Sequence, residues 1–113
     1  MKELDNVITN LNRCVKRYKS LSASNGLELN TLLKDISGYL YYLETVRADV
    51  HNEFEGYISE LVTSGESVAR ATNMANVKYP AMYKLRCIMR SGYNVVDAIR
   101  TNISYLKSEK NSI

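Results

Sequence analysis

The sequence predicts an all-α fold, a long helical hairpin or coiled-coil-like bundle with a short connecting helix. Apolar residues recur at spacings of three and four along most of the 113-residue chain, which is the period of one helix face. The chain contains five glycines and one proline, too few for the frequent turns of a β-sandwich. This length leaves room for one domain, so we expect a single helical domain over residues 1–113.

The first helix is predicted over residues 3–21. Its apolar stripe consists of Leu4, Val7, Ile8, Leu11, Val15 and Tyr18. Its cations gather toward the C-terminal end, where positive charge suits the helix dipole; they are Arg13, Lys16, Arg17 and Lys19. Residues 22–26 are typical of a loop, because Asn25 and Gly26 readily adopt the backbone conformations that end a helix.

The second helix is predicted over residues 28–63 and carries the clearest apolar pattern. At a rise of about 1.5 Å per residue it would be roughly 50 Å long, too long for a compact monomer of this size. We therefore expect it to assemble with other copies of the chain along one seam. The predicted oligomer interface consists of Leu33, Ile36, Leu40, Leu43, Arg47, Val50, Phe54, Tyr57 and Leu61. Arg47 breaks the apolar pattern, and either fixes the register of assembly or extends its stem outward to water.

Two further helices are predicted after residues 63–65. The first of them covers residues 66–76 and has Ser64 as its N-cap. The second covers residues 80–107, with Pro80 in its first turn, where a missing N–H costs nothing. We expect the tail that follows, residues 109–113, to fray. Whether residues 73–79 form a loop or a bend is left open by the pattern.

Cysteine usage and apolar runs bear on the compartment. The N-terminus carries Glu3 and Asp5 and lacks the apolar core of a signal peptide. No apolar run approaches the roughly 18 residues of a transmembrane helix, so we expect no membrane contact. Cys14 and Cys87 are then expected to be reduced, partly buried thiols, and the protein to be cytoplasmic, inside a bacterial host cell.

Catalytic and metal-binding patterns are weak in this sequence. His51 is the one histidine, and its spacing of four from Glu55 offers two potential metal ligands without a third. We found no glycine-rich phosphate loop and no serine- or cysteine-centred nucleophile motif. The sequence therefore predicts a protein that is not an enzyme and that holds no cofactor and no metal.

Charge is unevenly distributed along the chain. The net charge is +3 over residues 1–26, −5 over residues 27–63 and +5 over residues 64–113. An acidic middle between basic ends can pack against a complementary chain, can leave a basic surface free for a polyanion, or can be a chance asymmetry of solvated faces.

The last predicted helix carries arginines on one face with tyrosines between them, which is typical of contact with phosphates and bases. The predicted nucleic-acid-binding residues are Lys78, Lys84, Arg86, Arg90, Tyr93, Arg100 and Lys107. The alternative for the tyrosines is a place in the core or an interface, with the hydroxyl in water.

Residues 77–108, VKYPAMYKLRCIMRSGYNVVDAIRTNISYLKS, resemble the C-terminal part of the small recombination mediators of tailed bacteriophages, the UvsY type. The shared features are an aromatic start, a cysteine-containing turn, a Ser-Gly pair and Asp97-Ala98-Ile99 followed by Arg100. The resemblance implies a helical protein that forms rings, binds single-stranded DNA and helps to load a recombinase. That family has a basic cluster before its Ser-Gly loop; residues 60–63 here are ELVT, so no functional residue transfers from it.

Two functional hypotheses follow. The first is a phage accessory protein of DNA recombination or replication that oligomerises and binds single-stranded DNA to assist a recombinase. The alternative is a non-enzymatic phage inhibitor that binds and sequesters a host defence protein or a nucleotide signal, with the acidic face of the long helix imitating nucleic acid. Capture from host lysate distinguishes them, since the first would recover DNA-processing factors and the second one specific host protein.

Overall fold

The fold is all-α, as predicted. A computed structural model describes residues 2–22 and 25–111, and within them the chain forms four helices and no strand. The helices are α1 (Lys2–Ser20), α2 (Gly26–Thr63), α3 (Val68–Lys78) and α4 (Ala81–Asn111). The described chain is elongated, with principal extents of 68 × 30 × 20 Å.

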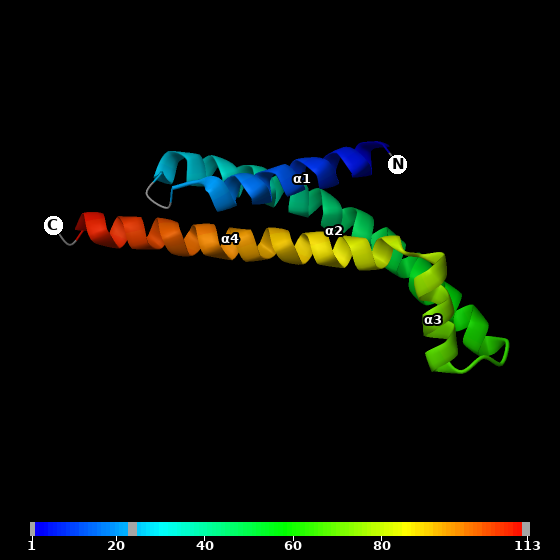
Figure 1. The fold of residues 1–113 in the computed structure, drawn as a ribbon. Helices are drawn as coiled ribbons and strands as arrows, with labels where there is room; N and C mark the ends of the chain where they lie inside the picture. Colours follow the sequence, from blue (N-terminus) through cyan, green and yellow to red (C-terminus); the bar gives the residue numbers. More distant parts are fainter. Residues whose placement is uncertain (1, 23–24, 112–113) are drawn as a thin grey trace.

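The helices form two parts, a bundle and an arm (Figure 1). The bundle consists of α1, the N-terminal half of α2, and α4, which lie side by side. The arm, residues 51–79, consists of the C-terminal part of α2 with α3 packed against it, and it projects from one end of the bundle. The long helix α2 thus belongs to both parts, and finds different neighbours along its length.

The bundle has one continuous hydrophobic core. Twelve buried side chains of the described residues form it: Leu11, Val15, Leu29, Leu32, Ile36, Leu40, Leu43, Leu85, Met89, Val95, Val96 and Ile99. Gly92 lies where the helices approach most closely, because a Cβ added there would come within 2.9 Å of Leu40 Cδ2 and 3.4 Å of Leu11 Cδ1. A glycine inside α4 therefore has a packing reason that compensates for its poor helix propensity.

The arm is much less well buried than the bundle. Within residues 51–79 only Ala71 and Ala75 are buried. Phe54 and Tyr57 on α2 meet the ring of Tyr79 edge-on, with centroids 6.4 and 5.9 Å apart. These half-buried rings join α2 to the end of α3 by contacts worth of order 1 kcal/mol each.

The structure changes the interpretation of the long apolar seam. Ile36, Leu40 and Leu43 are buried against α1 and α4 of the same chain, and Leu33 and Val50 pack partly on the same core. These contacts occupy the side chains that were expected to pair with other copies. The reason is that α1 and α4 fold back along α2, so its length does not require a partner chain.

Arg47 and the arm residues of that seam lie elsewhere. Arg47 is exposed, and Val46 packs on the core in its place. The Nε atom of Arg47 lies 4.0 Å from Glu44 Oε2. Arg47 therefore neither sets the register of the helices in the bundle core nor interrupts the apolar packing there. Phe54, Tyr57 and Leu61 are half-buried in the arm. Self-association of the chain stays a prediction.

The bounds of α3 differ from the prediction by two residues at each end. Its N-cap is Ser67, whose Oγ accepts a hydrogen bond from the Arg70 N–H at 3.2 Å. Ser64, predicted as that cap, instead ends α2 by donating its N–H to the Glu60 carbonyl at 3.0 Å. Gly65 then turns the chain with a φ of 106°, which favours glycine. The predicted start was therefore two residues early.

The later part of the chain is more helical than predicted. α3 runs on to Lys78, so residues 73–78 are neither a loop nor a bend. α4 begins at Ala81, directly after Pro80, and extends to Asn111, beyond the predicted end at 107. Residues 112–113 of the predicted frayed tail lie outside the described residues.

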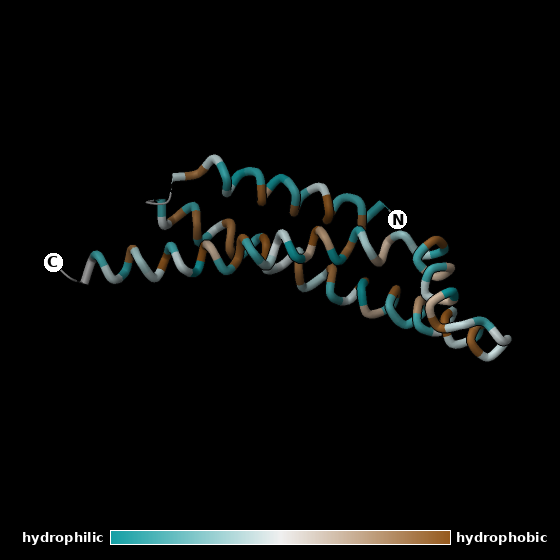
Figure 2. The backbone as a smooth tube through the Cα atoms, turned by 60° about the horizontal axis from the view of Figure 1, so that its bottom comes forward, coloured by the Kyte–Doolittle hydropathy of each residue, from teal (hydrophilic) through white to brown (hydrophobic). Residues whose placement is uncertain are grey.

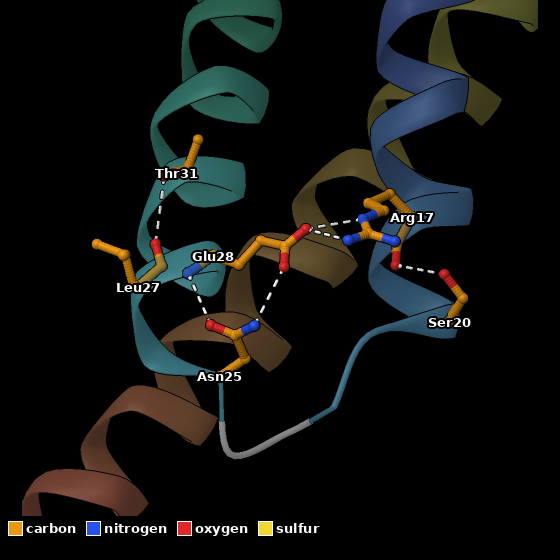
Figure 3. A network of polar contacts seen from close by, with 6 residues as sticks. All are labelled: Arg17, Ser20, Asn25, Leu27, Glu28 and Thr31. Carbon is orange, nitrogen blue, oxygen red and sulfur yellow. Dashed lines mark hydrogen bonds and ion pairs between the residues drawn. The ribbon is translucent and has the colours of Figure 1, made fainter.

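A capped junction connects α1 to α2 (Figure 3). Asn25 Oδ1 accepts a hydrogen bond from the Glu28 N–H at 3.2 Å, and Asn25 Nδ2 donates to Glu28 Oε2 at 3.1 Å. Glu28 also forms an ion pair with Arg17 near the end of α1, with Nε at 2.8 Å. Asn25 therefore starts the second helix, whereas it was expected to help end the first; Ala23 and Ser24 of the predicted loop lie outside the described residues.

We expect Asn25→Ala to lower the free energy of unfolding by about 1 kcal/mol, because the first turn of α2 loses the acceptor for a backbone N–H. Chemical denaturation with circular dichroism detection measures this. Asn52→Ala is the control, since Asn52 is exposed in the middle of the same helix. Equal losses in the two variants would contradict a capping role.

Apolar and polar residues alternate in short stretches along all four helices (Figure 2). No helix in residues 2–22 and 25–111 combines the length and the apolar character needed to cross a membrane.

Candidate nucleic-acid interface

The structure distributes the predicted nucleic-acid-binding residues over different places. Lys78 lies in the arm, with its Nζ 4.2 Å from the centroid of the Tyr57 ring. Lys84 lies on the side of α4 that faces α1, in a hollow also lined by Ile8 and Asn12. The remaining five, which share another flank of α4 because they are spaced by three, four or seven, are Arg86, Arg90, Tyr93, Arg100 and Lys107.

Arg86, Arg90 and Arg100 are exposed and have no carboxylate partner among the described residues. The arginines that form ion pairs within the described residues lie on the other three helices. These pairs are Arg17 with Glu28, Arg47 with Glu44, and Arg70 with Glu66. Three guanidinium groups on α4 therefore keep their charge and their donors available for an anion.

Tyr93 is poorly placed for a base or a phosphate. Its hydroxyl donates a hydrogen bond to Glu44 Oε1 at 2.7 Å, and this bond, followed by partial burial, raises the pKa of Tyr93. Glu44 and Asp97 both line the hollow of about 310 Å³ around it, next to Arg100. Two carboxylates beside Arg100 weaken its attraction for a phosphate relative to that of Arg86 and Arg90, without neutralising it by an ion pair.

Lys107 lies apart from the arginines. It lines a small hollow with Gly26 and Asn30 at the start of α2. The positive charge on this flank of α4 is therefore concentrated around Arg86 and Arg90. Arg100 lies farther along the helix, beside Glu44 and Asp97.

A second basic surface, which the sequence pattern did not reveal, lies between α1 and α4. Its centre is a hollow between the two helices, which we call the α1/α4 groove, and a second hollow on α1 alone adjoins it at Asn12. The first, of about 400 Å³, is lined by Ile8, Asn12, Tyr83, Lys84, Cys87, Ile88 and Ser91. The second, of about 450 Å³, is lined by Thr9, Asn12, Arg13 and Lys16. No carboxylate lines either hollow.

The sequence held only a partial signal for this groove. Arg13 and Lys16 are three residues apart and so share a face, but they are some 70 residues from Tyr83 and Lys84. Their position near the end of a helix also had a simpler explanation in the helix dipole. The packing of α1 against α4 brings Asn12 to Tyr83 and Lys84, whereas Arg13 and Lys16 line the adjoining hollow on α1.

Acidic and basic residues separate along the chain at the turn before α3. Residues 48–66 contain five carboxylates and no lysine or arginine, whereas residues 67–96 contain five lysines or arginines and no carboxylate. The carboxylates of Asp49, Glu53, Glu55 and Glu60 are exposed and form no ion pair within the described residues. The acidic face of α2 is thus uncompensated, as is the basic face of α4.

His51 and Glu55 are both exposed on the arm. The described residues contain no group of three His, Cys, Asp or Glu side chains placed to hold a metal ion.

The two cysteines have different surroundings. Both are free thiols; Cys14 is half-buried, but Cys87 is exposed, so the prediction of a partly buried thiol is wrong for Cys87. Burial, followed by the negative charge of Asp35, raises the pKa of the Cys14 thiol.

We expect iodoacetamide at about pH 8 to modify Cys87 well before Cys14. Cys87 is exposed, while the raised pKa of Cys14 lowers its thiolate fraction at any given pH and its burial limits access. Peptide mass spectrometry after timed quenching measures both rates. Guanidinium denaturation should bring the rates together, and equal rates in the folded protein would contradict the packing of α1.

Comparison with family models, curated proteins and solved structures found no match to this chain. The resemblance of residues 77–108 to phage recombination mediators accordingly remains an expectation.

Proposed function

We propose that this protein binds single-stranded DNA without catalysing a reaction, and that it acts as a phage accessory protein of recombination that assists a recombinase. The observation that supports DNA binding is the set of exposed, unpaired guanidinium groups at Arg86, Arg90 and Arg100. The recombination role and the assembly of several copies rest on the resemblance of residues 77–108.

The spacing of these arginines suits an extended polyanion. At about 1.5 Å per residue, Arg86 and Arg90 are separated by roughly 6 Å along α4, and Arg86 and Arg100 by roughly 21 Å. A strand lying along the helix would therefore meet several phosphates. Guanidinium groups bind phosphate oxygens through paired N–H donors and keep their charge at any physiological pH.

A second candidate function is supported by the exposed carboxylates of α2. Asp49, Glu53, Glu55 and Glu60 present unpaired carboxylates on one long helix. Such a surface suits a partner that itself binds nucleic acid. In this role the protein would be an inhibitor that sequesters a host defence protein.

Fluorescence anisotropy of a labelled oligothymidine, measured at low and then at moderate salt, tests the leading proposal. Three phosphate contacts predict that log K falls against log salt with a slope of about −2 for a single strand. Absence of binding at low salt would overturn DNA binding. In that case, recovery of a specific host protein from lysate by the native chain, lost when Glu53, Glu55 and Glu60 are changed to glutamine, would support the second candidate.

A further inference from the structure

The α1/α4 groove combines an exposed aromatic ring, apolar side chains and a lysine, with no carboxylate among the residues that line it. Ile8 and Ile88 are half-buried and give it an apolar base. Tyr83 lines it with a side chain that is 71% exposed, so the ring can accept a stacked partner. This hollow, of about 400 Å³, lies within the roughly 300–1,000 Å³ typical of small-molecule sites.

Polar groups complete the groove. Asn12 and Ser91 supply an amide and a hydroxyl that can meet the polar edge of a base. Lys84 borders the same hollow, and Arg13 and Lys16 border the adjoining one across Asn12. The groove therefore offers an aromatic and apolar surface together with one cation, Lys84.

We propose that the α1/α4 groove binds one nucleotide unit, with the base against Tyr83 and the two isoleucines and the phosphate near Lys84. The unit has two possible sources, one residue of a bound single strand or a free nucleotide. For the strand source the inference rests on the proposed function, whereas binding of a free nucleotide stands independently of it.

The hollow on the other flank of α4 also contains tyrosines, apolar side chains and an arginine, but it differs in its negative charge. Glu44 and Asp97 line it, and the Tyr93 hydroxyl is already hydrogen-bonded to Glu44. A phosphate there would face two carboxylates, whereas the α1/α4 groove presents none among its lining residues. The electrostatics therefore favour Tyr83 and Lys84 over the predicted Tyr93 as the contacts of a nucleotide.

Cys87 provides a direct reporter, because its exposed thiol lines the groove while Cys14 is half-buried. The native protein is treated with iodoacetamide in the presence of thymidine 5′-monophosphate, thymidine, inorganic phosphate or an oligothymidine. Peptide mass spectrometry follows both cysteines. We expect nucleotide to slow the modification of Cys87 several-fold and to leave Cys14 unchanged.

Variants of Tyr83 separate stacking from general charge. Because alanine cannot stack on a base, we expect Tyr83→Ala to weaken the protection of Cys87 about tenfold, while Tyr83→Phe keeps the ring and the protection. Tyr105→Ala is the matched control, since Tyr105 is a 63% exposed ring on the same helix, far along the chain from the groove. Tyr83 is exposed, so these variants are expected to fold.

The outcomes distinguish the two proposals. Protection by the monophosphate supports a free nucleotide as ligand, and protection by oligothymidine alone supports a base of a bound strand. The nucleotide site in the groove is overturned if the oligothymidine binds without protecting Cys87. It is also overturned if Tyr83→Ala leaves the protection unchanged. In both cases the proposal of DNA binding by α4 is unaffected. If neither the oligothymidine nor the monophosphate binds, both the proposed DNA binding and the proposed nucleotide site are overturned.

Discussion

Replacing Leu43 by alanine should lower the free energy of unfolding by about 2–5 kcal/mol, the usual cost of truncating a fully buried leucine. Leu43 has no exposed surface and lies in the core that α2 shares with α1 and α4. The substitution removes apolar packing and leaves a cavity that three rigid helices cannot readily close. A loss of this size is a large fraction of the stability of a domain this small.

Leu27→Ala is the matched control for Leu43→Ala. It is the same chemical change in the same helix, at a side chain that is 82% exposed, so we expect a change of at most about 0.5 kcal/mol. Urea denaturation followed by circular dichroism at several protein concentrations measures both. Contacts within one chain predict a Leu43→Ala loss that does not depend on concentration. The opposite result would be a urea midpoint of the unsubstituted protein that rises with protein concentration, and a midpoint of Leu43→Ala that does not. That result would place Leu43 at a contact between chains.

Changing Arg86, Arg90 and Arg100 together to glutamine should greatly reduce affinity for single-stranded DNA. Each arginine that contacts a phosphate releases counterions when the strand binds, so the slope of log K against log salt should become shallower by about 2. Glutamine keeps a long side chain with good helix propensity, and all three positions are exposed, so the fold should be retained. Anisotropy of a labelled oligothymidine measures affinity and slope.

The chain offers a control with the same loss of charge. Arg17, Arg47 and Arg70 each form an ion pair with a carboxylate, so changing these three to glutamine lowers the net charge equally. If the positions on α4 bind DNA, this control should keep most of the affinity and of the salt slope. If the two triple variants lose the same amount of affinity for DNA, net charge alone attracts the strand. The assignment of the DNA-binding site to α4 would then be wrong.

Much of the fold was predictable from local pattern. The apolar spacing of Leu29, Ile36 and Leu43 on α2 predicted a helix, and the predicted bounds of α1 and α2 agree with the structure to within two residues. Periodicity succeeds here because a helix repeats every 3.6 residues whatever its neighbours are. The error at the start of α3 arose because Ser64 and Ser67 are both suitable caps, and only the backbone path after Gly65 chooses between them.

The candidate sites were less predictable, because they depend on which helix faces lie side by side. Spacing on α4 correctly grouped Arg86, Arg90 and Arg100, but it also included Lys84, which lies on the side facing α1, and Tyr93, whose hydroxyl bonds to Glu44. The partners of Tyr93 and Lys84 come from helices that are distant in sequence. No local pattern specifies those neighbours.

The sequence by itself determined that this protein is helical, where its four helices lie to within a few residues, and which faces are apolar or basic, since these follow from side-chain chemistry and helical period. The tertiary structure decided what covers each face. It placed Ile36 and Leu40 inside the chain, because α1 and α4 return along α2 and bury that stripe. It also brought Asn12 and Lys84 to one hollow, because packing of helices, unlike their formation, depends on residues far apart in the chain.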